Sequence, residues 1–141
     1  CGFDGGKRVK GRKRHIAVDV MGMLLGVLVL PANFSDDYGA KALLRQIAFV
    51  TRWLLIIFDG GYDKPPLIDW CQNMFGVAVQ ISRRIAEQGF VVIPKRWIVE
   101  RTFGWLNRSR RLSKDYEERS DVSEAMIYIA MIHLMLRRLH R

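Results

Sequence analysis

Two acidic residues, Asp59 and Glu100, stand at positions where a carboxylate could bind a metal ion. Asp59 directly follows the apolar run from Trp53 to Phe58 and precedes two glycines. In open α/β sheets, ligands bind beyond the carboxyl ends of the strands, so an acid at such a point suits a metal or phosphate site. The alternative is an Asp-Gly turn with no chemical role, and this segment alone does not separate the two interpretations.

Glu100 lies in a segment whose periodicity predicts a helix over residues 96–111. The expected apolar stripe consists of Val99, Phe103 and Leu106, and the expected basic neighbours of Glu100 at helical spacings are Arg96, Arg108 and Arg111. One carboxylate among arginines suits a metal ligand beside bound phosphates. The alternative is an ion-paired surface glutamate.

Positive charge is the main feature of the composition, with a formal net charge of +9. The cations are concentrated in three clusters: Lys7, Arg8, Lys10, Arg12, Lys13 and Arg14; then Arg108, Arg110, Arg111 and Lys114; and finally Arg137, Arg138 and Arg141. Clustered cations on a chain with a hydrophobic core favour a polyanionic partner, most simply a nucleic acid. A solvated basic surface or a membrane-surface patch is the alternative.

The remaining composition indicates one globular domain, or part of one. The chain has 141 residues, of which 50% are hydrophobic. We expect it to be soluble and intracellular, because no apolar run is long enough to span a bilayer. Cys1 and Cys71 have no spacing typical of a zinc site or a disulfide framework, and structural roles are expected for the three histidines.

The predicted elements give a mixed sheet flanked by helices. Residues 1–15 are expected to be a loop because glycines interrupt them, and Met21-Gly22 suggests a hairpin. Strands are expected at 16–20, 23–30, 53–58 and 77–81, the second of them central in the sheet. Helices are expected from Ser35 to about Thr51, and at 67–75, 96–111 and 122–139. Asp121 and Glu124 resemble a capping box for the last helix.

Several segments together resemble the bacterial insertion-sequence transposases that have RNase H-like DDE catalytic domains. These segments are GRKRHIAVD at 11–19, Pro31-Ala32-Asn33 with Asp36 and Gly39-Ala40, FDGGYD at 58–63, GFVVIPKRWIVERTFGWLNRSRRLSKDY at 89–116, and SEAMIYIAMIHLMLRRL at 123–139. The resemblance covers essentially the whole chain. It implies an α/β, RNase H-like fold and a single, incomplete catalytic domain over residues 1–141.

In that family, two Asp and one Glu hold two divalent metal ions for phosphodiester chemistry. The resemblance matches the Asp that closes the fourth strand to Asp59 and the helical Glu to Glu100. The family signature Y-x2-R-x3-E-x6-K is kept at Arg96 and Glu100, whereas Ile93 and Asn107 replace its Tyr and Lys. The first Asp of the family triad would lie on a strand before Cys1, so we expect this chain to lack the first strand of the fold.

The function that the resemblance implies is DNA transposition by metal-dependent cleavage and transfer of strands at transposon ends. Two Mg²⁺ (or Mn²⁺) ions are expected in the complete domain, and we expect this chain to be inactive alone. A nucleic-acid-binding remnant without catalysis is the alternative. The expected partner is DNA, at transposon ends and target, with a homo-oligomer as a further expectation and neither a membrane nor a small-molecule substrate. The expected location is the bacterial cytoplasm, at the nucleoid. The expected DNA-binding residues are Arg12, Lys13, Arg14, Arg96, Arg108 and Arg111.

Overall fold

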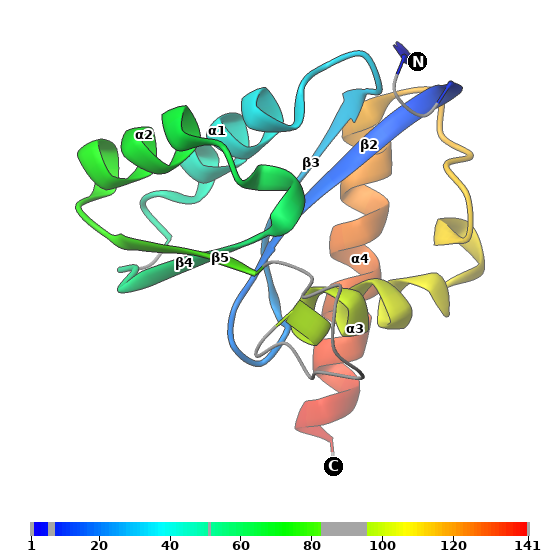
Figure 1. The fold of residues 1–141 in the computed structure, drawn as a ribbon. Helices are drawn as coiled ribbons and strands as arrows, with labels where there is room; N and C mark the ends of the chain where they lie inside the picture. The colour runs from blue at the N-terminus through cyan, green and yellow to red at the C-terminus, as the bar shows by residue number, and fades with distance from the viewer. Residues whose placement is uncertain (1, 6–7, 51, 83–95, 141) are drawn as a thin grey trace, which may run out of the picture.

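In the part of the chain that the structure describes, the fold is a mixed α/β arrangement in which four helices flank two small sheets (Figure 1). It is seen in a computed structural model that describes residues 2–5, 8–50, 52–82 and 96–140, with the side chains of Val9 and Arg96 left out. The predicted RNase H-like fold class is confirmed at the level of this α/β architecture. The elements are β1 (Gly2–Asp4), β2 (Val9–Val18), β3 (Leu24–Pro31), α1 (Asp36–Ile47), β4 (Leu55–Asp59), the 3₁₀ turn η1 (Gly60–Tyr62), α2 (Pro65–Phe75), β5 (Ala78–Ser82), α3 (Arg96–Asn107), the 3₁₀ turn η2 (Arg110–Leu112) and α4 (Ser120–Leu139).

The first sheet is antiparallel, in the order β1-β2-β3. The expected hairpin is present, and its turn is closed by Asp19, whose Oδ1 accepts hydrogen bonds from the backbone N–H groups of Met21 and Met23. Gly22 in this turn has φ +81°, a left-handed conformation that glycine adopts at low cost.

The prediction of a loop over residues 1–15 is wrong, because β1 and most of β2 lie there. The segment from Val9 to His15 shows no apolar alternation because its inward-facing positions are basic. The side chains of Arg12 and Arg14 point to one face of the sheet and reach residues 112–118, while Lys13 points to the other face and reaches Asp4 and Asp36. Ion pairs and hydrogen bonds therefore replace the hydrophobic contacts that would have identified the strand.

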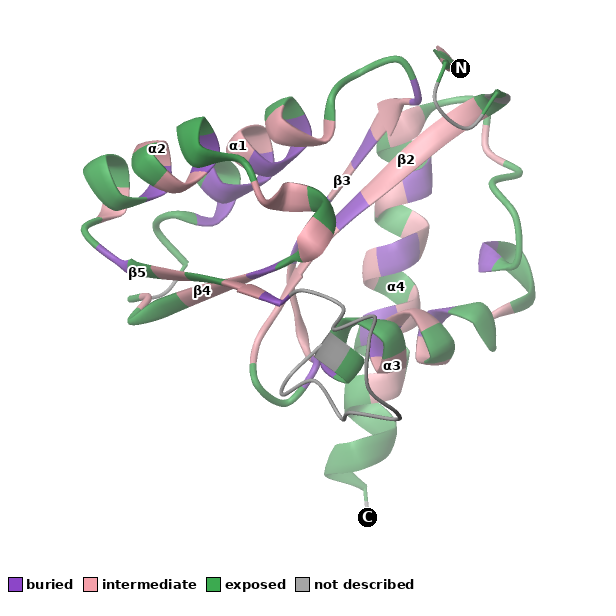
Figure 2. Ribbon diagram, viewed as in Figure 1, coloured by how far each residue is buried: buried purple, intermediate pink, exposed green. Residues whose placement is uncertain are grey.

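Helices cover both faces of the β2–β3 hairpin and produce two hydrophobic clusters. On one face, Leu43, Leu44 and Ile47 of α1 pack with Phe58 and Leu67. On the other face, residues of β3 pack with Leu106, Leu112, Ile127 and Met131 from α3, η2 and α4. Figure 2 shows these buried stripes on the sides of α1 and α4 that face the strands.

β3 is buried on both faces as expected, but it is not the predicted central strand. Within the described residues it pairs with β2 alone and forms the edge of its sheet. Side chains of α4 cover that edge, since Tyr128 Oη and Glu124 Oε1 accept hydrogen bonds from the backbone N–H groups of Val27 and Val29. A periodicity of hydrophobic residues reports burial and does not report the number of neighbouring strands.

The second sheet is the parallel pair of β4 and β5, connected by α2. Its order and strand positions agree with the predicted alternation of strands and helices. Gly76 ends α2 with φ +62°, as expected for a glycine at a helix C-terminus. Ser35 caps α1, because its Oγ accepts a hydrogen bond from the backbone N–H of Tyr38, and the helix ends at Ile47 and not near Thr51 as predicted.

The predicted capping box of the last helix is wrong. α4 begins at Ser120, and its N-cap residue, Arg119, makes no side-chain capping bond. Asp121 pairs with Arg119, while the carboxylate of Glu124 turns inward to β3. Among the described residues, the helices include none with the length and hydropathy that a membrane crossing requires.

Candidate active site and nucleic-acid interface

Asp59 is the last residue of β4, at the carboxyl end of the parallel pair. Phe58 before it is buried in the α1 side of the core, whereas Asp59 itself is exposed. Its Oδ1 accepts a hydrogen bond of 2.8 Å from the backbone N–H of Gly60 and so begins η1. A Cβ placed on Gly61 would meet nothing within 4 Å. Asp59 is thus held at the end of a strand, where the sequence predicted it, and the space around Gly61 is open.

The negative charge of Asp59 also contributes to the raised pKa of Tyr62. Burial, and then the charges of Asp36 and Asp59, raise the pKa of Tyr62 to about 12. The Tyr62 hydroxyl lies 3.1 Å from Nδ1 of His15 and joins η1 to β2. His15 is buried, and a Cβ on Gly39 would approach its ring to 2.4 Å, so α1 packs directly on the imidazole. The packing therefore indicates a structural role for His15, as expected.

Glu100 lies in the second turn of α3 and is exposed. The buried positions of this helix are Ile98, Thr102 and Leu106, so the expected stripe through Val99 and Phe103 is displaced by one residue. Thr102 fixes the helix to the hairpin turn, because its Oγ1 lies 2.8 Å from the carbonyl oxygen of Gly22 and 3.0 Å from that of Ile98. The helix therefore presents Glu100 on the side opposite its buried stripe.

The expected surroundings of Glu100 are only partly realised, because α3 ends at Asn107 and not at Arg111. The chain turns at Ser109, whose backbone N–H bonds to the carbonyl of Leu106, and continues into η2. Arg111 is therefore not on the helical face of Glu100. The side chain of Arg96 and residue Ile93 of the family signature lie outside the described residues.

A stack of aromatic and guanidinium groups lies on a face of α3 that contacts the hairpin turn, and sequence reasoning did not identify it. The Arg101 guanidinium lies 4.4 Å from the ring centre of Trp97 and 4.7 Å from that of Trp105. Arg138 of α4 lies 4.2 Å from the Trp105 ring centre. The signal was present in the sequence, because residues 97, 101 and 105 repeat at four-residue spacing and so share one face of a helix.

No three His, Cys, Asp or Glu side chains form a possible metal-binding group within residues 2–5, 8–50, 52–82 and 96–140. Asp59 and Glu100 belong to two differently packed parts of the molecule. Asp59 lies in the part that packs with α1 and η1, and Glu100 lies on α3, which packs on the hairpin turn and α4. Carboxylate oxygens are the donors that Mg²⁺ prefers, so each residue suits the ion in kind.

Three of the residues expected to contact phosphates make ion pairs or hydrogen bonds within the chain. The Arg12 side chain is only 8% exposed; Nη1 lies 3.1 Å from the Asp115 carboxylate and 2.7 Å from the Glu117 carbonyl, and Nη2 donates to the Glu118 carbonyl. Arg14 donates a hydrogen bond of 3.1 Å to the Leu112 carbonyl. Lys13 pairs with Asp4 and Asp36 at 3.4 and 3.2 Å. Partial desolvation acts to lower the pKa of Lys13, but the hydrogen bonds and charges of Asp36 and Asp4 outweigh it and raise that pKa.

The second basic cluster is exposed to solvent. Arg108, Arg110, Arg111 and Lys114 all lie on the exposed surface at and around η2. Arg111 is paired with Glu117 at 3.3 Å, but its side chain remains 64% exposed. Cations of this region therefore face outward, and so do Arg137 and Arg138 of the third cluster.

Comparison with known proteins identifies the family. Residues 1–135 match the family described as "Transposase DDE domain". The chain is also 28% identical over 139 residues to the "Putative transposase for insertion sequence element IS402" of Burkholderia cepacia, an alignment that covers 93% of this chain and 65% of that protein. The chain thus spans somewhat less than two thirds of the length of this relative. No solved structure matches the chain. DDE transposases are in general nucleases and strand transferases that use divalent metal ions. The match of residues 1–135 of this chain shows that the chain belongs to the transposase DDE domain family.

Proposed function

We propose that this chain is part of a transposase catalytic domain, in which Asp59 and Glu100 are two of the carboxylates that bind divalent metal ions for DNA strand cleavage and transfer. The observation that carries the proposal is the position of Asp59 at the carboxyl end of a parallel strand, in a chain that matches the DDE family over residues 1–135. The strand end fixes where the carboxylate lies, and the residue type fixes which ions it suits.

Two Mg²⁺ or Mn²⁺ ions, held in part by Asp59 and Glu100, would supply Lewis-acid activation of the attacking oxygen and stabilisation of the leaving oxygen. The protein's part is to hold its carboxylates in place. For Asp59 this is done by the Gly60 N–H and the adjoining η1, and for Glu100 by the anchoring of α3 through Thr102. In DNA binding, the exposed arginines at 108, 110 and 111, together with Arg96, would contact phosphates.

We further propose that a strand preceding Cys1 carries the third carboxylate. What supports this is the pairing of the strands. On the side of β2 opposite β3, the described residues pair only at Val9–Gly11, and β4 pairs with β5 alone. The bond between His15 and Tyr62 keeps these two open edges in the same part of the molecule. One added strand, antiparallel to β2 and parallel to β4, would join the two sheets into one, and its end would lie near Asp59.

The test is metal-dependent cleavage of matching transposon ends by a protein that includes the residues preceding Cys1. Glu100→Gln and Asp59→Asn should each abolish cleavage, because an amide keeps the shape of the side chain and loses the charge that binds the ion. The matched control is Asp69→Asn, which neutralises an exposed acid on α2 and should cleave normally. Folding and DNA binding should be unchanged in all three variants. Cleavage by Glu100→Gln at the normal rate would show that Glu100 is not a ligand.

The alternative, a remnant that binds nucleic acid without catalysis, predicts a different outcome of the same experiment. The extended protein would fold and bind DNA ends, but it would not cut them with either ion. The replacements at Ile93 and Asn107 would then be the residues to restore, as Ile93→Tyr and Asn107→Lys. Recovery of cleavage in that double variant would place the defect in phosphate positioning and leave the metal ligands as proposed.

A further inference from the structure

Ser82 is the last residue of β5, and its neighbour on β4 is Asp59. The parallel pair of strands is in register from Leu55 and Ala78 to Asp59 and Ser82, so the last two residues lie side by side at its carboxyl end. Figure 1 shows both strands ending on the side of the molecule that holds the β2–β3 hairpin and α3. Ser82 therefore lies next to the proposed metal ligand, at the end of the pair where ligands bind.

The side chains of Asp59 and Ser82 lie on the same face of the pair. Successive side chains of a strand point to opposite faces, and register partners on neighbouring strands share a face. Phe58 and Ile81, the partners one position earlier, both pack in the hydrophobic cluster formed with α1 and α2. Asp59 and Ser82 are therefore on the other face, on backbones separated by the usual strand spacing of about 4.8 Å.

The hydroxyl of Ser82 is buried without a partner. Ser82 is only 6% exposed, and its Oγ makes no hydrogen bond within the part of the chain that the structure describes. His15, Asp37 and Arg101 also have a buried atom without a partner, but each of these side chains makes a hydrogen bond or ion pair through another atom. The hydroxyl is the sole polar group of the Ser82 side chain. Buried hydroxyls are normally hydrogen-bonded, so this one is available to a group that changes position when a ligand binds.

We propose that Ser82 is a positioning residue of the metal site, and that its hydroxyl donates a hydrogen bond to the Asp59 carboxylate when that carboxylate binds a divalent ion. This inference rests on the proposed function of Asp59. At the spacing of neighbouring strands, rotation about side-chain bonds alone brings a hydroxyl and a carboxylate within hydrogen-bond distance. A carboxylate has about four lone-pair sites, so Asp59 can accept this bond and the bond from the Gly60 N–H and still bind an ion.

The chemistry of the serine side chain fits this role. A carboxylate that binds a metal ion is held in direction by donors in its surroundings, and loss of such a donor weakens metal binding about 10- to 100-fold. The Ser82 hydroxyl carries no charge, so it does not repel the cation. Because Oγ is shielded from solvent, water does not compete with the carboxylate for its proton. Gly60 supplies one donor from the backbone of η1, and Ser82 supplies a second from the neighbouring strand.

The first test is Mn²⁺ binding by the protein that includes the residues preceding Cys1, measured from the electron paramagnetic resonance signal of free Mn²⁺. Ser82→Ala should bind Mn²⁺ about 10-fold more weakly than the parent protein. Ser82→Thr keeps the hydroxyl at a strand position that accepts a β-branched residue, and it should restore most of the affinity. The matched control is Ser123→Ala, at a serine of α4 that is 1% exposed, and its affinity should be unchanged. Equal affinities of Ser82→Ala and the parent protein would overturn the proposal.

The second test separates this role from a purely structural one. Without metal, Ser82→Ala should unfold at the same urea concentration as the parent protein or at a higher one, because it removes a buried hydroxyl that has no partner. With Mn²⁺ at the concentration that half-saturates the parent protein, the unfolding midpoint should rise more in the parent than in the variant. A lower midpoint of Ser82→Ala without metal would show that Ser82 stabilises the metal-free fold, and the proposal would be wrong.

The variant Asp59→Asn distinguishes a failure of this inference from a failure of the proposed function. If Asp59 is a ligand, Asp59→Asn should bind Mn²⁺ far more weakly than the parent protein. A loss of affinity in Asp59→Asn, with none in Ser82→Ala, would overturn the role of Ser82 alone. No binding by the parent protein, or unchanged binding by Asp59→Asn, would overturn the metal-binding role of Asp59 and the role of Ser82 with it.

Discussion

The carboxylate of Glu124 accepts a hydrogen bond of 2.7 Å from the backbone N–H of Val29, which joins α4 to the edge of β3. Unpaired edge strands promote aggregation, and native proteins cover them with helices or charges. Here an acidic side chain provides both the cover and the hydrogen-bond acceptor. The same contact, together with the bond from the Val27 N–H to the Tyr128 hydroxyl, fixes which side of α4 faces outward.

Replacing Glu124 tests this relationship. Glu124→Leu should lower the free energy of unfolding by about 2 kcal/mol, because it leaves the Val29 N–H buried without an acceptor. Glu124→Gln should lose less, since its amide oxygen can still accept the bond. Urea denaturation measures both. An equal loss in the two variants would mean that the charge of Glu124, and not its hydrogen bond, stabilises the contact.

Arg12 should behave as a structural residue. Its guanidinium binds three acceptors in the segment before α4, so Arg12→Ala should destabilise the protein by about 2–3 kcal/mol. The exposed Arg110 is the matched control, and Arg110→Ala should change stability by no more than about 0.5 kcal/mol. The measurement is again urea denaturation, and a loss of equal size in both variants would contradict the structural role.

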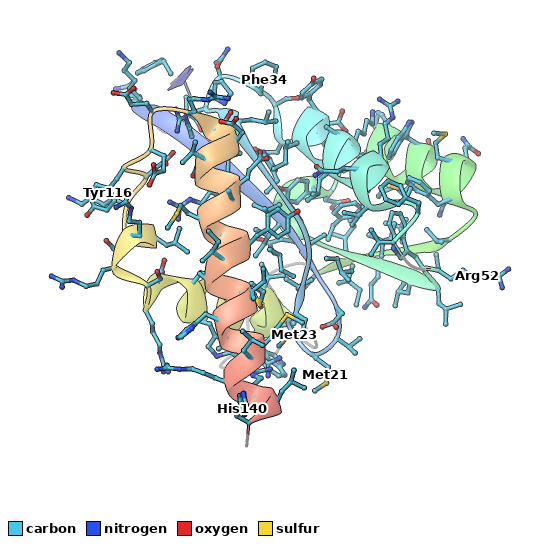
Figure 3. All side chains as sticks on the ribbon, turned by 180° about the vertical axis from the view of Figure 1, so that it is seen from behind. Met21, Met23, Phe34, Arg52, Tyr116 and His140 are labelled. Carbon is cyan, nitrogen blue, oxygen red and sulfur yellow. The ribbon has the colours of Figure 1, made fainter. Side chains whose placement is uncertain are left out.

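DNA binding should depend on the arginines at the end of α3 and around η2. Arg108→Ala and Arg111→Ala should each reduce the slope of log K against log salt by about 0.9, the contribution of one phosphate contact. Arg52 is a suitable control, because it is exposed on the opposite side of the molecule from Tyr116, which follows η2 (Figure 3). Arg52→Ala should leave the slope unchanged. Slopes that do not differ among the three variants would place the DNA on another surface.

The sequence was sufficient to predict the elements whose residues are apolar and periodic. The core of α1, the apolar β3 and β4, and the glycine at the end of α2 all follow from local patterns. The sequence did not predict β1 or the first half of β2, because the stability of these strands comes from long-range pairs. Arg12 meets Asp115, more than a hundred positions away, and no local periodicity encodes that contact.

The candidate site was predictable only in part, and for a similar reason. The position of Asp59 follows from the apolar strand before it. The prediction of phosphate-contacting residues treated Arg12, Lys13 and Arg14 in the same way as Arg108 and Arg111, because both clusters are basic in sequence. Only the tertiary structure shows that the first three bind partners within the chain. The sequence shows where cationic residues are clustered, but it does not show which residues they contact in the folded protein.

The stability of the protein should depend on pH through His15. Burial, the main cause, and the nearby charge of Lys13 lower the pKa of His15 below its ordinary value of 6.5, although Asp36 acts in the opposite direction. At pH values above 6.5, the imidazole is neutral in both the folded and the unfolded chain, and its contribution to stability is complete. As the pH falls below 6.5, His15 binds a proton in the unfolded chain but stays neutral in the folded chain. Stability is then lost progressively until the folded-state pKa is reached.

His15→Gln should remove this dependence, because glutamine can keep a hydrogen bond to the Tyr62 hydroxyl but does not titrate. The measurement is the free energy of unfolding in urea at several pH values from 7.5 down to 5, with the slope bounded by about 1.4 kcal/mol per pH unit for one proton. Carboxylates also titrate toward the lower end of this range, so the relevant quantity is the difference between the parent chain and the variant. That difference should be flat above pH 6.5 and should change below it. A parent and a His15→Gln profile that run parallel across the whole range would show that His15 takes up its proton equally in the folded and unfolded chains, and that its burial under α1 does not govern its ionisation.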